Sequence, residues 1–369
     1  MRLSFLDSIR GIASLIVVTA HLHYTAGAET WFVDLYVLRI FKASAFAVAI
    51  FFVLSGLVLF LQVEGERVSY IKFVVRRAFR IFPACAVAVT VSYAIYVFWE
   101  PQPVLSRGSW FNDVSWPPGI PTDTYIGHLL LDGSDALLRP IWSLVIEWRV
   151  SLIYPAIVIM LVWSPIFAGI LAIALAVAIA AAPTSILFTG LYGIPGSYLI
   201  AAYYSTLFAA GAFIAAYRLE LIIFFRRWPM TRYALWAICV YFLCFRSLRD
   251  GLLFGLIGCA LIVVCMSQSS VRQFLRMKSL RYLGKISYCL YLVHIIWIGV
   301  LFRVLDGVHP LLISSAVIVA SVLSADLMSR FIEIPANRMG RAIVHAVKWP
   351  AFITSGPRSG RRVARVSVP

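Results

Sequence analysis

The chain has 369 residues, 62% of them hydrophobic and 13% charged, and a mean hydropathy of +0.91. These values lie outside the range of soluble domains and predict a protein with several membrane spans. The net charge of +16 does not indicate a nucleic-acid partner, because the basic residues spread over one set of alternate loops, as the positive-inside rule alone produces.

Ten apolar stretches reach the roughly 17 to 25 residues needed to cross a bilayer. They lie near residues 8–26, 40–61, 82–99, 143–162, 165–183, 197–217, 232–248, 251–267, 283–304 and 310–332. With the N-terminus in the cytoplasm, 24 of the 32 Lys and Arg residues fall on the cytoplasmic side, so both termini are predicted to lie inside. We therefore expect an all-α membrane domain of about ten helices over 1–340, followed by a basic, partly disordered cytoplasmic tail over 341–369.

The first stretch carries several polar residues. Arg10 and His21 share one helical face with Asp7, Ser14 and Thr25, and roughly 16 Å of helix separates the two. Ionisable groups inside a membrane span are expensive, which makes them candidates for a functional site. The same polar residues argue against a cleaved signal peptide, whose core is a short apolar run, so we expect this helix to be retained.

His21 by itself also fits a second interpretation, a neutral histidine that hydrogen-bonds to a neighbouring helix. The presence of Asp7 and Arg10 on the same face favours a functional role. His23 lies about 200° from His21 around the helix, so the two cannot share a metal ion as an i, i+4 pair can. The six cysteines show no C-x-x-C spacing, and neither a metal site nor a disulfide framework is predicted.

Two arginines, Arg77 and Arg80, share a helical face at the cytoplasmic end of the third predicted span. The planar guanidinium group suits recognition of phosphate. Arginines at such helix ends are also ordinary signals of membrane topology. Their spacing alone is therefore only a weak indication of a phosphate site.

The fourth predicted span contains one acidic residue, Glu147, on a face with Ser143, Ser151 and Tyr154. The first helix is expected to run outward and the fourth inward, which places His21 and Glu147 each roughly 6 to 8 Å from the outer end of its helix. Two interpretations stay open for Glu147. It is either a carboxylate that orients His21 as a general base or one partner of a buried ion pair with an arginine.

The segment over 100–141 is the longest between spans on the outer side. It contains Trp110 and Trp116, which can anchor the chain at the membrane interface or offer aromatic faces to a sugar ring. We favour anchoring, with sugar contact as the smaller alternative.

Six segments, in order along nearly the whole chain, resemble the integral-membrane acyltransferase 3 family. They are Phe5-Leu6-Asp7-Ser8-Ile9-Arg10-Gly11-Ile12-Ala13 with His21, Phe51-Phe52-Val53-Leu54-Ser55-Gly56, Arg77-x-x-Arg80-Ile81-x-Pro83, Trp142-Ser143-Leu144-x-x-Glu147, Leu283-Gly284-x-Ile286-Ser287-Tyr288-x-Leu290-Tyr291-Leu292-x-His294 and Glu333-x-Pro335. Members of this family are multi-helix enzymes that move an acyl group, often acetyl, from a cytoplasmic acyl-CoA to hydroxyls of carbohydrates or other acceptors.

The resemblance implies roles for the motif residues. His21 would be the catalytic residue of an Arg-x10-His motif, and Glu147 matches the fourth-helix acid of the family. Arg77 and Arg80 would form an Arg-x-x-Arg motif that receives the phosphates of CoA. In this interpretation Arg10 adds to the phosphate site, and the pantetheine arm of the donor spans the distance to His21.

In the expected reaction His21 removes a proton from the acceptor hydroxyl and returns it to the departing thiolate. The developing oxyanion needs hydrogen-bond donors. Ser143, Tyr154 and His294 are candidates for this role, and the sequence does not rank them.

We therefore expect a membrane O-acyltransferase of the bacterial inner membrane. Its donor substrate is acyl-CoA, with acetyl-CoA favoured, and no permanently bound cofactor is expected. The acceptor is a carbohydrate such as exopolysaccharide, lipopolysaccharide or a glycolipid, and polysaccharide-assembly proteins are candidate partners. Two other functions fit the intramembrane charges: a proton-coupled transporter or flippase for a glycolipid or small metabolite, and a membrane scaffold whose polar stripe is purely structural.

Overall fold

The computed structural model describes residues 4–27, 30, 36–63, 69–180, 194–245 and 251–347, and in these ranges the chain forms helices and no strand. The first half contains α1 (Ser4–Ala26), η2 (Tyr36–Lys42), α2 (Ser44–Val63), α3 (Tyr70–Trp99), α4 (Ser109–Val114), α5 (Asp123–Leu130), α6 (Ile141–Trp163) and α7 (Pro165–Ala180). The second half contains α9 (Ile194–Ala216), α10 (Arg218–Arg227), α11 (Pro229–Phe245), α12 (Gly251–Ser267), α13 (Ser269–Leu275), α14 (Lys278–Val304), α15 (Pro310–Met328), η4 (Ser329–Glu333) and α16 (Ile334–Ala346). The prediction of an all-α membrane protein is confirmed.

Seven helices in the described part of the chain are long and apolar enough to cross a membrane, or eight if a bent pair counts as one span. The seven match seven of the ten predicted stretches. The bent pair is α12 and α13, which meet at 100°, whereas α7 and α11 are shorter, at 16 and 17 residues. The predicted stretches at 165–183 and 232–248 each run on into residues outside the described ranges, so a count of ten stays a prediction.

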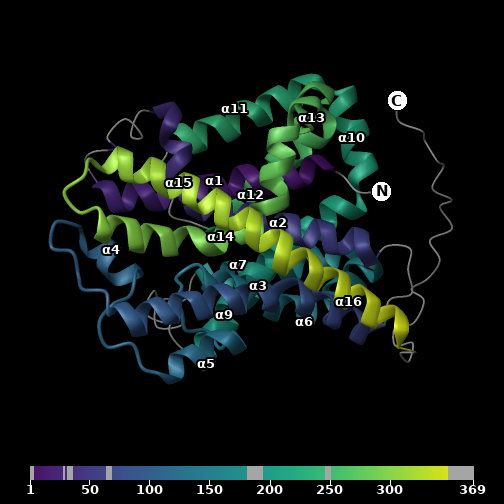
Figure 1. Cartoon of the computed structure of the whole chain (residues 1–369). Helices are drawn as coiled ribbons and strands as arrows, with labels where there is room; N and C mark the ends of the chain where they lie inside the picture. Colours follow the sequence, from purple (N-terminus) through teal and green to yellow (C-terminus); the bar gives the residue numbers. More distant parts are fainter. Residues whose placement is uncertain are drawn as a thin grey trace.

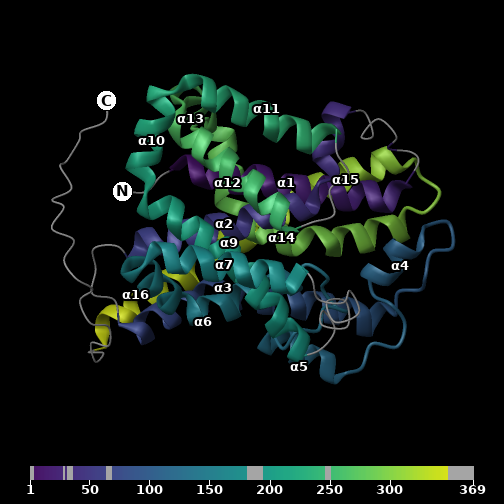
Figure 2. The same cartoon turned by 180° about the vertical axis from the view of Figure 1, so that it is seen from behind.

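The most extensive pairing of helices is between α1 and α14, which lie side by side in Figures 1 and 2. A Cβ atom on Gly11 would come within 2.6 Å of the backbone nitrogen of Gly284, so only glycine permits this close approach. Ten residues further along each helix, His21 meets His294. The two helices therefore run parallel, and their glycine contact sets the register of the histidines.

The bundle has two distinct ends. The short helices α4 and α5 lie at one end, and the start of α1 and the end of α16 lie at the other (Figure 1). We call these the α4 end and the α16 end. Helices α15, η4 and α16 form one continuous helical segment, Pro310–Ala346, so helix continues past residue 340, where we expected the membrane domain to stop. The remaining tail, from 348 onward, lies outside the described residues.

Candidate active site

The clearest feature near the α4 end is a direct contact between two imidazole rings. His21 Nδ1 lies 2.9 Å from His294 Nε2, and the rings are stacked with centroids 5.1 Å apart. His294 Nδ1 lies 3.2 Å from the carbonyl oxygen of Leu290. A carbonyl only accepts, so His294 carries its proton on Nδ1 and accepts from His21 at Nε2. Neutral His21 then has its proton on Nδ1 and a free lone pair on Nε2.

A second polar contact lies one helical turn from His294. The hydroxyls of Tyr291 and Ser143 are 2.7 Å apart, and the rings of Tyr291 and His294 have centroids 6.0 Å apart. Ser143 and Glu147 share a face of α6, at i and i+4. We call the series Glu147, Ser143, Tyr291, His294 and His21 the polar column, since it leads through the bundle from α6 to α1.

Glu147 does not meet His21, which corrects one of the two interpretations of this acid. Its Oε1 accepts from Arg77 Nη2 at 2.6 Å and from Ser55 Oγ at 3.3 Å. Arg77 Nε also donates to Ser151 Oγ at 3.1 Å. The reason lies in its neighbours: Glu147 pairs with Arg77 and lies within electrostatic range of Arg10, which is roughly 16 Å along α1 from His21. The structure supports the other interpretation, an ion pair with an arginine, in a partly buried form.

Arg80 forms the second ion pair of this region, with Glu333. Glu333 also accepts from Cys289 Sγ at 3.1 Å, and the Arg80 guanidinium lies 5.2 Å from the centre of the Tyr288 ring. Arg10 interacts electrostatically with both Arg80 and Arg77. We call Arg10, Arg77 and Arg80 the arginine cluster; the structure brings all three together, as the resemblance implied, but two of them are already paired with carboxylates.

Two predicted supporting residues have structural partners. Tyr154 is fully buried and donates to the carbonyl of Gly56 at 2.5 Å, which ties α6 to α2 and removes its hydroxyl from the surroundings of His21. Asp7 lies within electrostatic range of Arg10 rather than near the histidines. Of the three candidate oxyanion donors, therefore, Ser143 and His294 belong to the polar column and Tyr154 does not.

The segment between α3 and α6 packs against the helical bundle. Trp116 is 3% exposed and donates to Ser92 Oγ at 2.9 Å. The ring of Trp110 lies 5.2 Å from the imidazole of His21. Trp116 is therefore buried inside the protein and does not face lipid, whereas for Trp110, which is half-buried, membrane anchoring stays a prediction.

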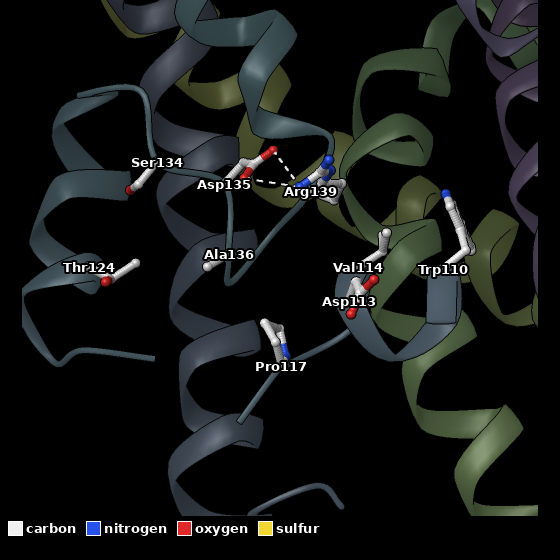
Figure 3. A pocket seen from close by; sticks show the side chains of 9 residues that line it. All are labelled: Trp110, Asp113, Val114, Pro117, Thr124, Ser134, Asp135, Ala136 and Arg139. Carbon is white, nitrogen blue, oxygen red and sulfur yellow. Dashed lines mark hydrogen bonds and ion pairs between the residues drawn. The ribbon is translucent and has the colours of Figure 1, made fainter. Parts of the chain in front are cut away.

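A cavity of about 430 Å³ opens beside Trp110. One wall comes from α4 and the residues that follow it, and the other from the connection between α5 and α6, where Asp135 and Arg139 form an ion pair of 3.3 Å (Figure 3). Arg139 also interacts electrostatically with His21. We call this space the α4 cavity.

Two ionisable groups of the α5–α6 connection are shifted by their surroundings. Burial raises the pKa of Asp135 to about 6, against the opposing effect of Arg139. Burial lowers the pKa of His128 below its usual 6.5. Both ring nitrogens of the neutral His128 have hydrogen-bond partners: Nδ1 lies 2.8 Å from the Thr124 carbonyl oxygen, and Nε2 accepts from the Leu137 backbone N–H at 3.3 Å.

Sequence reasoning quoted Tyr291 and Glu333 as family motif residues but gave them no place in the site. The sequence contained a signal for Glu333, since this acid directly follows the last predicted span and stands two residues before Pro335. In the structure Glu333 is buried and lies at the end of a π-helix, Ser329–Glu333. Such single-turn π segments often lie at functional positions. Ser55 belongs to a quoted family segment but was given no place in the site, and Arg139 had no signal of its own, because only tertiary packing brings it there. Within the described residues no group of His, Cys, Asp and Glu is placed to hold a metal ion.

Comparison with known proteins places the chain in a family. It is 28% identical to peptidoglycan O-acetyltransferase OatA of Listeria monocytogenes serovar 1/2a (strain ATCC BAA-679 / EGD-e), over 91% of this chain and 56% of that protein. It is 26% identical, over 93% of this chain and 57% of the other, to YrhL of Bacillus subtilis (strain 168), a protein provisionally named for the same activity. The chain thus spans a little over half the length of these relatives. No solved structure matches it.

The family model for an acyltransferase domain matches residues 3–330. That range includes α1 with both Arg10 and His21, the arginine cluster, Glu147 and His294. It therefore covers the polar column in full, and the chain belongs to the acyltransferase 3 family.

Proposed function

We propose that this protein is a membrane O-acyltransferase that moves an acyl group, acetyl by preference, from cytoplasmic acyl-CoA to a hydroxyl of a carbohydrate. The observation that carries the proposal is the contact of His21 with His294, because it leaves the Nε2 lone pair of His21 available as a general base. Membership of the acyltransferase 3 family supports acyl transfer over the alternative of a proton-coupled transporter.

The reaction requires one proton acceptor that later becomes a proton donor. Nε2 of His21 takes the proton of the acceptor hydroxyl as its oxygen attacks the thioester carbonyl. The resulting imidazolium is stabilised by His294, whose Nε2 accepts the hydrogen bond from Nδ1 of His21. The tetrahedral intermediate then breaks its C–S bond, and His21 returns the proton to the departing thiolate, which leaves an ester and free CoA.

The arginine cluster is the proposed site of the donor phosphates. Three guanidinium groups lie together there, roughly 16 Å along α1 from His21, and guanidinium is well suited to phosphate. Arg77 and Arg80 are paired with Glu147 and Glu333, so a phosphate must compete with these carboxylates. Donor binding would therefore rearrange the ion pairs of this region.

The names of the relatives support a cell-envelope polysaccharide as the acceptor. Both are named for O-acetylation of peptidoglycan, a carbohydrate polymer of the class expected from the sequence. The bacterial inner membrane is the proposed location, since it gives access to acyl-CoA on one side and to envelope glycans on the other.

The test is acyl transfer by the purified protein in lipid nanodiscs with labelled acetyl-CoA and glycan acceptors. His21→Ala should lower the rate by about 10² to 10⁴, the usual contribution of a general base, with an unchanged melting temperature. His23→Ala is the matched control, because His23 lies on the other side of the same helix and contacts Thr30 at 2.7 Å. Full activity of His21→Ala would refute the proposal.

A further inference from the structure

We propose that the α4 cavity is the binding site for one uncharged sugar ring of the acceptor, with Trp110 as the stacking platform and the Asp135–Arg139 pair as the hydroxyl-binding group. This inference rests on the proposed function and names the acceptor site within it. It is carried by the shape and position of the cavity, its chemistry and the rigidity of its walls.

The position of the cavity ties it to the reaction centre. Trp110 contributes to its wall and is also the ring neighbour of His21, at 5.2 Å. Arg139 lines the opposite wall and interacts electrostatically with the same imidazole. A sugar held between these two side chains places its hydroxyls beside His21, whereas the arginine cluster lies toward the other end of the bundle.

The chemistry of the lining suits a sugar. A volume of about 430 Å³ falls within the range of small-molecule pockets, roughly 300 to 1,000 Å³. Trp110 is half-buried and presents an indole face, and the apolar C–H face of a pyranose packs on such a surface. Figure 3 shows Asp135 and Arg139 joined by their ion pair, between Trp110 on one side and Ser134 and Thr124 on the other. A carboxylate accepts hydrogen bonds from hydroxyls and a guanidinium donates to them.

The charges of the lining favour a neutral ligand. Arg139 is neutralised by Asp135, which is 5% exposed. Asp113, an exposed residue of α4, adds a further negative charge to the lining. A phosphate or carboxylate ligand would meet repulsion from these acids. The cavity therefore does not suit the CoA phosphates, and it suits an uncharged pyranose.

The wall that carries Trp110 is held by Arg303 of α14. Arg303 donates to the side chain of Ser115 at 2.6 Å and to its carbonyl at 2.7 Å. Its guanidinium also lies 4.7 Å from the centre of the Phe111 ring and 5.5 Å from that of Trp116. Since α14 also carries His294, one helix positions both the cavity wall and the partner of His21.

The opposite wall is held by His128. Its Nδ1 also lies 3.0 Å from Ser134 Oγ, and its Nε2 accepts from the Leu137 backbone. These contacts fix the connection that carries Asp135. Both walls are therefore ordered before a ligand arrives, which lowers the entropic cost of binding.

The experiment compares two reactions of the full-length protein in nanodiscs: hydrolysis of acetyl-CoA by water, and transfer to methyl β-glucoside, methyl β-N-acetylglucosaminide or tri-N-acetylchitotriose. Trp110→Ala and Asp135→Asn should raise the acceptor KM about ten- to a hundredfold, the range for loss of one pocket contact, and should lower transfer more than hydrolysis. Trp163→Ala and Asp123→Asn are the matched controls, because Trp163 is 75% exposed and Asp123 is exposed, both outside the cavity. Trp110→Phe should give an intermediate KM and guards against misfolding of the alanine variant.

An unchanged acceptor KM in both cavity variants would overturn the proposal, as would equal losses of hydrolysis and transfer. His21-dependent hydrolysis without transfer to any of the three sugars would overturn the choice of a neutral sugar. A failure of the proposed function would give a different result, because the wild-type protein and His21→Ala would then show the same activity.

Discussion

The two ends of the polar column are built from different chemistry. At the arginine cluster, full charges meet full charges: Arg77 pairs with Glu147 at 2.6 Å, and Arg80 pairs with Glu333. At the α4 end, two histidines share one hydrogen bond, and Trp110, the ring neighbour of His21, lines the α4 cavity. The first region holds helices α3, α6 and η4 together through interactions that are costly to break. The second contains a neutral imidazole, His21, whose Nδ1 is engaged by His294 and whose Nε2 can accept a proton.

This difference separates structural from chemical roles for ionisable groups inside a membrane. A carboxylate locked to arginine is a poor proton acceptor, since its negative charge is already stabilised. A neutral imidazole with one nitrogen engaged and one free is suited to accept a proton. This difference supports the proposed roles, with proton transfer at His21 and donor binding at the charged region.

The largest effect is expected where a buried charge loses its partner. Glu147→Ala leaves Arg77 unpaired and should destabilise the fold by about 3 to 5 kcal/mol, seen as a lower melting temperature and loss of folded protein. Glu147→Gln, which retains a hydrogen-bond acceptor for Arg77 and Ser55, should lose less. If Glu147→Ala melts like the wild type yet is inactive, the acid acts in the chemistry and the contrast between the two ends fails.

At the histidine pair we expect a loss of activity with little loss of stability, the reverse of the effect at Glu147. His294→Ala removes the acceptor for Nδ1 of His21 and should lower kcat about 10- to 100-fold, as loss of an orienting partner commonly does, with acceptor KM and melting temperature little changed. His294→Asn offers an oxygen acceptor and should recover part of kcat. A variant that unfolds, or one whose acceptor KM alone changes, would show that His294 does not position the base.

A substitution at the glycine contact between α1 and α14 tests whether the register of these helices matters to the pair of His21 and His294. Gly11→Ala places a Cβ atom within 2.6 Å of the Gly284 backbone and should cost about 1 to 3 kcal/mol through overpacking, together with a fall in kcat as the histidines separate. Gly169→Ala on α7 is the control, because a Cβ there meets nothing within 4 Å. Equal behaviour of the two variants would remove the argument that close packing sets the register.

The smallest effect is expected on the stability of the fold at acidic pH, through His128 near the α4 end. His128 has a lowered pKa, so its contribution to stability is complete above pH 6.5 and is lost as the pH falls below this value toward the folded-state pKa. Asp135 acts with the opposite sign, since its raised pKa of about 6 favours the protonated form in the folded protein. The difference between wild type and His128→Gln isolates the first effect. If the melting temperatures of wild type and His128→Gln differ by the same amount at neutral pH and at about pH 5, the predicted effect of His128 is contradicted.

The prediction of the site from sequence succeeded for residues that lie on one helix. Arg10 and His21 face the same way because a helix has a fixed angular step, and Arg77 and Arg80 are neighbours for the same reason. It did not decide between the two interpretations of Glu147, because these depend on which neighbouring helix the acid meets. The distance of Glu147 from the end of its helix left a contact with His21 open, and in the structure the acid meets Arg77 instead.

By itself, then, the sequence determined an all-helical membrane protein, the family and the faces on which polar residues lie, because composition and the helical period are local properties. Only the tertiary structure decided which faces meet. The glycine contact between Gly11 and Gly284 sets α1 parallel to α14 and pairs His21 with His294. The packing of α4 against the bundle brings Trp110 beside His21, a contact that the sequence did not predict. These contacts depend on helix packing and on the path of a connecting segment, which no single helix encodes.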